Sequence, residues 1–150
     1  MVRRGKFAHE TSSTKLSEEP NKLPGRRAVA ATEFAVCLPL IVVLLLGTLE
    51  ASTMIFLKQS LSIAAYEGAR SAMTADAVAA DVETSCNIIL SQRNVAGGTV
   101  VVTPAPLESQ PVRSWITVTV SAPASSNSVI QGLFYSSHTV AARTSMMKEY

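Results

Sequence analysis

The sequence predicts an α+β protein, in which an N-terminal transmembrane helix continues into an amphipathic helical stem and is followed by a small antiparallel β-sheet domain. Three observations indicate this fold class. A long apolar stretch lies near the N-terminus, small apolar residues recur at helical spacing after it, and β-branched runs fill the second half of the chain. We therefore expect a basic leader (1–28), a transmembrane helix (29–58) and an extracytoplasmic α+β domain (59–150).

The composition excludes several classes of protein. Of the 150 residues, 47% are apolar and 16% are charged, which is the opposite of the balance in a disordered chain. The two cysteines form no CxxC motif and no Cys/His cluster with zinc-ligand spacing, so we expect no metal site and no cofactor. The net charge is only +2, and the basic residues do not alternate with aromatic ones, which argues against a nucleic-acid partner.

The N-terminal segment is basic. Residues 1–27 contain seven Lys or Arg and three Glu, a net charge of +4. They hold few large apolar side chains, so we expect a disordered tail. Basic residues next to a membrane span favour the cytoplasmic side, so residues 59–150 are expected on the other side of the membrane.

An uncharged apolar run, Phe34–Leu49, follows the basic segment, and after Glu50 the apolar character resumes up to Lys58. As a helix, Phe34–Leu57 would be about 36 Å long, enough to cross a hydrocarbon core of about 30 Å. Glu50 and Lys58 would then mark the outer interface. A cleavable secretory signal is the alternative, but the run is long for one and no clean small-x-small site follows it.

Two residues interrupt the pattern of the span. Glu33 lies just inside it, where insertion of a carboxylate costs about 3 kcal/mol, so it should lie at the headgroup level or have a cationic partner. The residues alone leave both options open. Pro39 removes one helical hydrogen bond, which is compatible with a bend used in bundling and with a tolerated membrane proline.

Five short motifs follow one another between residues 26 and 75: Arg26-Arg27-Ala28, Glu33-Phe34-Ala35, Leu38-Pro39-Leu40, Gly47 with Glu50, and Ala65-Tyr66-Glu67-Gly68-Ala69-Arg70. Together they resemble the class III prepilin signal and, in detail, the TadE-like minor pseudopilins of tight-adherence (Flp) pilus systems. The resemblance implies a pseudopilin-like fold and a minor pilin-like subunit, in the bacterial inner membrane, for assembly of a type IVb-like pilus. Its partners would be a prepilin peptidase, other pilin and pseudopilin subunits, and the pilus assembly platform.

The resemblance also implies roles for individual residues. The peptidase would cut between Ala28 and Val29, and it needs a small residue and an extended, basic approach before the cut. Glu33 would become residue five of the mature chain and meet the new α-amino group of a neighbour, while Phe34 and Pro39 would take part in assembly. Ala28 stands where the family usually has glycine. The alternative function is an unprocessed, bitopic scaffold or binding subunit of a secretion or pilus complex.

Beyond the membrane the helix is predicted to continue as a stem. A stripe of small and apolar residues recurs at helical spacing: Leu57, Leu61, Ala64, Ala65, Gly68, Ala72, Ala75 and Ala79. Glu67 and Arg70 form an i,i+3 pair, which on a solvated face contributes only a few tenths of a kcal/mol. The resemblance instead implies a specific contact for Glu67, Gly68 and Arg70.

A second helix is predicted from the spacing of Val78, Val82, Cys86 and Ile89, and residues 97–98, both glycine, are expected to end this segment. We interpret Cys86 as a buried small side chain rather than an intermolecular link.

Three strands are predicted from β-branched residues, at Thr99–Thr103, Trp115–Ser121 and His138–Met147. In the second strand, odd-numbered and even-numbered residues should face opposite sides of the sheet. Trp115 is expected to anchor the core or a sheet face. No GxSxG, P-loop, HExxH or paired-carboxylate motif occurs, and Ser136 and Ser137 beside His138 do not make a triad, so we predict no enzymatic activity.

Overall fold

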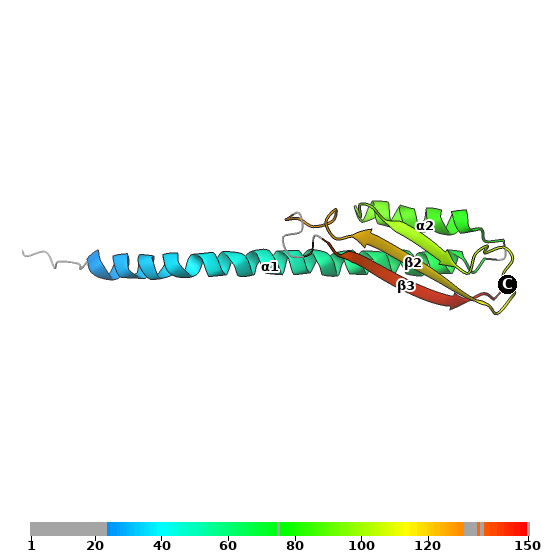
Figure 1. Ribbon diagram of the computed structural model, residues 1–150, viewed down its shortest axis with the longest axis horizontal. Coiled ribbons are helices and arrows are strands. Elements are labelled where there is room, and N and C mark those ends of the chain that lie inside the picture. The colour runs from blue at the N-terminus through cyan, green and yellow to red at the C-terminus, as the bar shows by residue number, and fades with distance from the viewer. Residues whose placement is uncertain (1–23, 75, 131–134, 136, 150) are drawn as a thin grey trace, which may run out of the picture. The chain divides into compact units, whose positions relative to one another are not determined.

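The computed structural model describes residues 24–74, 76–130, 135 and 137–149 (Figure 1). The chain divides into two compact units, Met1–Leu38 and Pro39–Tyr150. In the first unit the described residues belong to helix α1. The second unit holds the rest of α1, helix α2 and a three-stranded sheet. The predicted α+β fold, with a long apolar helix followed by a small antiparallel sheet, is confirmed.

Helix α1 spans Pro24–Ser71. It ends in a tightened turn, in which the N–H of Met73 donates to the carbonyl of Arg70 at 3.1 Å. The stem is therefore shorter than its small-residue stripe predicts. Ala79 belongs to the next helix, and Ala75 lies outside the described residues.

Helix α2 spans Ala79–Gln92, and its C-terminal end is a Schellman motif. Asn94 adopts a left-handed conformation with φ of +52°, and the N–H of Val95 donates to the carbonyl of Leu90 at 2.9 Å. The helix thus ends earlier than the glycine pair at residues 97–98, because an asparagine tolerates the left-handed conformation that closes the helix.

Strands β1 (Thr99–Thr103), β2 (Trp115–Pro123) and β3 (Thr139–Met147) form an antiparallel sheet in the order β1-β2-β3. The register places Val118 of β2 between Val102 of β1 and Thr144 of β3. The first strand agrees with its predicted bounds. The second continues further than predicted, and the third begins one residue later.

One face of the sheet packs against α2 and the C-terminal part of α1 (Figure 1). The core residues alternate along β2 and follow one side of each helix: Leu57, Leu61, Ala64, Ala65, Ala69 and Ala72; Val82, Cys86 and Leu90; Ile116, Val118, Val120 and Ala122. Most of the predicted stripe on α1 and the predicted alternation on β2 are confirmed. Trp115 lies on the other, open face and is 63% exposed, so it does not belong to the core.

Candidate functional site

The predicted cut between Ala28 and Val29 lies in α1, and both side chains are exposed. The expectation of a disordered tail is therefore wrong for residues 24–27, which are helical. The extended approach that the peptidase needs stays a prediction. This end of the helix is weak, because Gly25 has a low helix propensity and the positive charge of Arg26 lies near the positive end of the helix dipole. The first turn also contains no acidic residue that would interact favourably with the helix dipole. Local unwinding before the cut therefore costs little.

Glu33 and Phe34 follow on the same unit, and both are exposed. Within the part of the chain that the structure describes, the Glu33 carboxylate has no hydrogen bond and no ion pair. Phe34 is 59% exposed, so its ring is also available for contacts with another molecule or with lipid. The geometry is compatible with an intermolecular cationic partner for Glu33.

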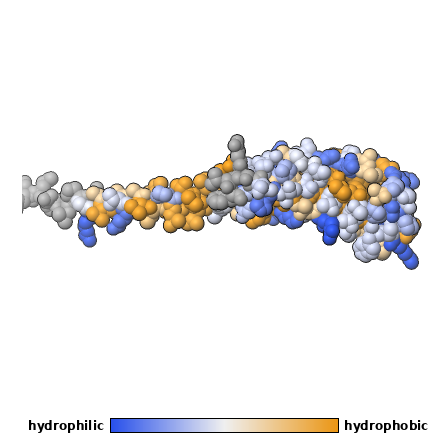
Figure 2. Space-filling view, in the orientation of Figure 1, coloured by the Kyte–Doolittle hydropathy of each residue, from blue (hydrophilic) through white to orange (hydrophobic). Residues whose placement is uncertain are grey.

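None of the most apolar part of α1 is buried inside the protein. Among the described residues, one helix is long enough and apolar enough to cross a membrane, and it covers Ala28–Ser71. Its most apolar window has a mean hydropathy of 2.5. Figure 2 shows apolar side chains gathered along this part of α1. Pro39 lies inside the helix, which continues past it. A helix with apolar side chains on all sides needs an apolar environment.

The three residues of the stem motif lie in different environments. A Cβ on Gly68 would overlap the Sγ of Cys86 and would lie 3.2 Å from Cγ1 of Val118. The glycine thus permits close packing of α1 with α2 and the sheet. Glu67 and Arg70 form a 3.6 Å ion pair on the surface, where Arg70 is 70% exposed. Such a pair contributes little to stability.

The thiol of Cys86 is buried, as predicted. It lies 3.4 Å from the carbonyl oxygen of Ala64, to which it donates. Burial, with a smaller contribution from the nearby carboxylate of Glu83, raises the pKa of Cys86 to about 11. A buried, protonated thiol is unreactive, so Cys86 is not exposed for a link to another chain.

Glu50 is the residue whose role the sequence did not reveal. Its side chain is fully buried within the protein, and its Oε1 accepts a hydrogen bond from the backbone N–H of Tyr135 at 3.2 Å. Its place at the outer interface of a membrane stays a prediction. Lys58, the other expected marker, donates to the carbonyl of Ala141 on strand β3. A single carboxylate after an apolar run indicates that a polar partner is needed. The neighbouring residues in the sequence do not identify that partner, which lies 85 residues away.

No group of three or more His, Cys, Asp or Glu that could hold a metal ion occurs among the described residues. His138 packs edge-on against Tyr135, with 5.7 Å between the ring centroids. Ser136 lies outside the described residues. The absence of enzymatic activity stays a prediction.

Residues 28–70 match the family model described as TadE-like protein. The matched segment begins at the predicted cut and ends at Arg70 of the stem motif, so the resemblance inferred from the five motifs is confirmed over this segment. The comparisons with curated proteins and with solved structures found no match. The match indicates involvement in a tight-adherence (Flp) pilus system.

Proposed function

We propose that this TadE-like chain is a minor pilin-like subunit of a tight-adherence pilus system, held in the membrane by α1 and matured by a prepilin peptidase. The observation that carries the proposal is the family match over residues 28–70, which includes Glu33 and the whole apolar run. The exposed apolar surface of α1 supports it. A membrane before assembly and neighbouring helices in a filament would each cover that surface.

Maturation removes residues 1–28 and makes Val29 the new N-terminus. The product starts with a free α-amino group at the beginning of an apolar helix. Because the bond to be cut is helical, the peptidase has to unwind the first turn of α1, which Gly25 facilitates. The methyl group of Ala28 is the smallest side chain after the hydrogen of the family's usual glycine, so it should fit a narrow subsite.

Assembly depends on Glu33, which becomes the fifth residue of the mature chain. The exposed carboxylate meets the new α-amino group of a neighbouring subunit as the helices pack together. A lone buried charge is strongly unfavourable, and a close opposite charge offsets much of that cost. Phe34 supplies apolar contact area beside this ion pair, and Pro39 permits the helix to bend within the bundle.

The basic N-terminal segment sets the topology. With a net charge of +4 over residues 1–27, the N-terminus is held in the cytoplasm of a bacterial cell and residues 59–150 lie outside the inner membrane. Protease added to spheroplasts should therefore digest the C-terminal domain. Protection of that domain until the membrane is permeabilised would show the opposite orientation.

Cleavage is tested by co-expressing the full chain with a cognate prepilin peptidase and measuring the intact mass. We expect loss of residues 1–28, with Val29 as the first residue by N-terminal sequencing. Ala28→Gly should preserve or improve processing, whereas Ala28→Phe should block it by overfilling the subsite. One variant makes the side chain at position 28 smaller and the other makes it larger. The pair therefore separates a requirement for small size from a general effect of mutation.

The second candidate function is an unprocessed, bitopic scaffold or binding subunit of a secretion or pilus complex. Two observations favour it: an alanine in place of the usual glycine before the cut, and the helical conformation of the bond itself. An unchanged full-length mass, in cells where the same peptidase cleaves another prepilin, would assign the chain to this second class.

A further inference from the structure

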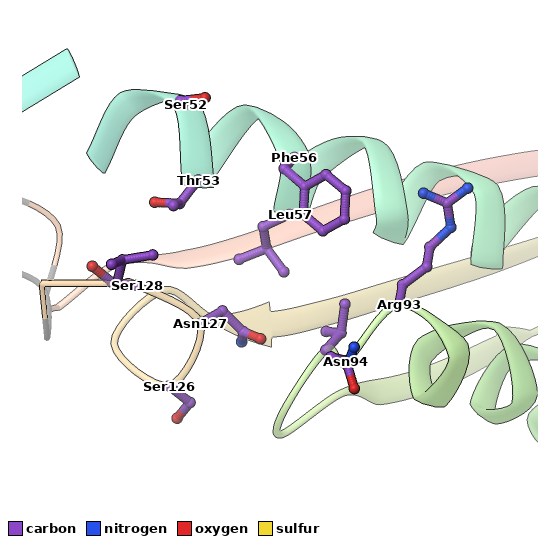
Figure 3. A pocket seen from close by; sticks show the side chains of 11 residues that line it. Ser52, Thr53, Phe56, Leu57, Arg93, Asn94, Ser126, Asn127 and Ser128 are labelled. Atoms are coloured by element: carbon purple, nitrogen blue, oxygen red, sulfur yellow. The ribbon is translucent and has the colours of Figure 1, made fainter. Parts of the chain in front are cut away.

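A pocket of about 580 Å³ opens beside α1, where the apolar run ends. Three segments line it: Ser52, Thr53, Phe56 and Leu57 of α1, the turn after α2 at Arg93–Val95, and the β2–β3 connection at Ser126–Val129 (Figure 3). Arg93 is the one charged residue among those that line the pocket, and none of them is acidic. The pocket therefore favours an anion.

The side chain of Arg93 is half-buried and has no hydrogen-bond acceptor or ion-pair partner in the described part of the chain. In Figure 3 it reaches from the turn after α2 towards α1. A guanidinium carries five N–H donors and stays charged at every physiological pH, so partial burial without an acceptor is unfavourable. Its planar fork matches the oxygen atoms of a phosphate group.

The polar walls of the pocket are fixed before any ligand binds. Asn127, in the β2–β3 connection, is bound to the turn after α2. Its Oδ1 accepts a hydrogen bond from the N–H of Ala96 at 2.8 Å, and its Nδ2 donates one to the carbonyl of Ala96 at 2.9 Å. The same Nδ2 donates to the carbonyl of Pro123, also at 2.9 Å. These bonds hold the turn that carries Arg93 against the β2–β3 connection. A ligand therefore does not have to order these loops on binding.

The remaining wall is formed by α1, where Ser52 and Thr53 are polar and Phe56 and Leu57 are apolar. Phe56 and Leu57 lie on the pocket side of the helix in Figure 3, and Phe56 is 52% exposed. Leu49, the last residue of the uncharged run, lies two helical turns before Phe56 and is 54% exposed. A ligand whose head group lies beside Arg93 can therefore place a hydrocarbon chain along α1.

We propose that this pocket binds the phosphate head group of an anionic phospholipid, with Arg93 as the ion-pair partner and the acyl chains along α1. Inorganic phosphate offers the same oxygen atoms, but it would make no use of the apolar side chains of Phe56 and Leu57. The inference requires that α1 is inserted in a membrane. It does not depend on cleavage or on a role in a pilus, so its failure and that of the proposed function are distinguishable.

The experiment titrates the full-length protein in nanodiscs or micelles with phosphatidylglycerol or phosphatidylcholine and measures bound lipid by native mass spectrometry. One Arg near an anionic lipid surface contributes about 1 kcal/mol, so Arg93→Gln should lower the apparent affinity for phosphatidylglycerol about fivefold. Arg93→Lys, which keeps the charge, should lower it less. Arg143→Gln is the matched control, because Arg143 is exposed on the open face of the sheet, opposite the core.

A selective loss in Arg93→Gln, with an unchanged circular dichroism spectrum, would support the proposal. Equal retention of the two lipids by the parent, or equal losses in Arg93→Gln and Arg143→Gln, would overturn it. Inorganic phosphate is added at millimolar concentration in a separate arm. If it displaces the bound lipid as effectively as an equal concentration of phosphatidylglycerol does, the acyl chains add no affinity and the assignment to a phospholipid is wrong.

Discussion

The Sγ atom of Cys86 on α2 lies over Gly68 on α1, in the space where any other residue would place its Cβ. The side chain of Val118 approaches the same position from the sheet, at 3.2 Å. One glycine therefore sets the distance between α1, α2 and β2. Because protein cores are closely packed, an added methyl group at this point has to be accommodated by movement of one of these elements.

Gly68→Ala should destabilise the domain by about 1–3 kcal/mol, since overpacking forces side chains or backbone out of position. The matched control is Gly47→Ala on the same helix, because a Cβ at Gly47 has no atom within 4 Å. Thermal unfolding of the full chain in detergent, followed through the β-sheet signal, gives the comparison. Similar melting temperatures for the two variants would contradict the packing role.

A double mutant tests whether the Sγ of Cys86 is the atom that limits the space at Gly68. In Cys86→Ala the Sγ is removed, so the combination with Gly68→Ala should be less destabilised than the sum of the two single variants. Strict additivity would mean that Val118 or the backbone, rather than the sulfur, limits the space at Gly68.

The stability of the domain should fall as the pH rises from about 9 to 11. In the folded protein burial raises the pKa of Cys86 to about 11, against 9.0 for an unperturbed thiol. Between these values the unfolded chain loses the proton and the folded chain keeps it, so the unfolded state is favoured as the pH rises. The effect is of the order of 2 kcal/mol. Urea titrations of the parent and of Cys86→Ala should diverge in this range, and parallel pH profiles would contradict the assignment.

Glu50 should stabilise the segment before β3 through its bond to the N–H of Tyr135. Glu50→Ala removes the acceptor and should cost about 1 kcal/mol, the usual net contribution of one hydrogen bond. Glu50→Gln keeps an oxygen acceptor and should cost less. Hydrogen exchange at the Tyr135 amide is the direct measurement. Equal protection in Glu50→Ala and the parent would show that this bond does not hold the segment.

The parts of the fold that depend on local patterns could be predicted from the sequence. The helical spacing from Leu57 to Ala72 predicts the buried side of α1, and the alternation that starts at Trp115 predicts the two faces of β2. Both patterns result from the geometry of a single element. The family match to residues 28–70 likewise rests on a contiguous segment, in which the motifs stand in order.

The contacts between distant segments could not be predicted. The bonds of Glu50 to Tyr135 and of Lys58 to Ala141 join residues more than 80 positions apart, and each residue alone carries no signal of its partner. The end of α2 was missed for a different reason. Glycine is a stronger sequence signal than asparagine for a residue in the left-handed conformation. The glycines at residues 97–98 were therefore predicted to end the segment, although Asn94 ends the helix.

The proposed pairing of Glu33 with a neighbouring subunit separates the processed subunit from an anchored scaffold. Glu33→Gln removes the charge with little change in shape, so insertion and cleavage should be unaffected. Breaking a buried ion pair costs several kcal/mol, and the yield of sheared pili should therefore fall at least about tenfold. Glu108→Gln, an equal charge change at an exposed position of the domain, should leave the yield unchanged. If Glu33→Gln assembles pili as well as the parent does, the pairing of Glu33 with a neighbour's amino group is wrong, even where intact-mass analysis confirms that Val29 is the mature N-terminus.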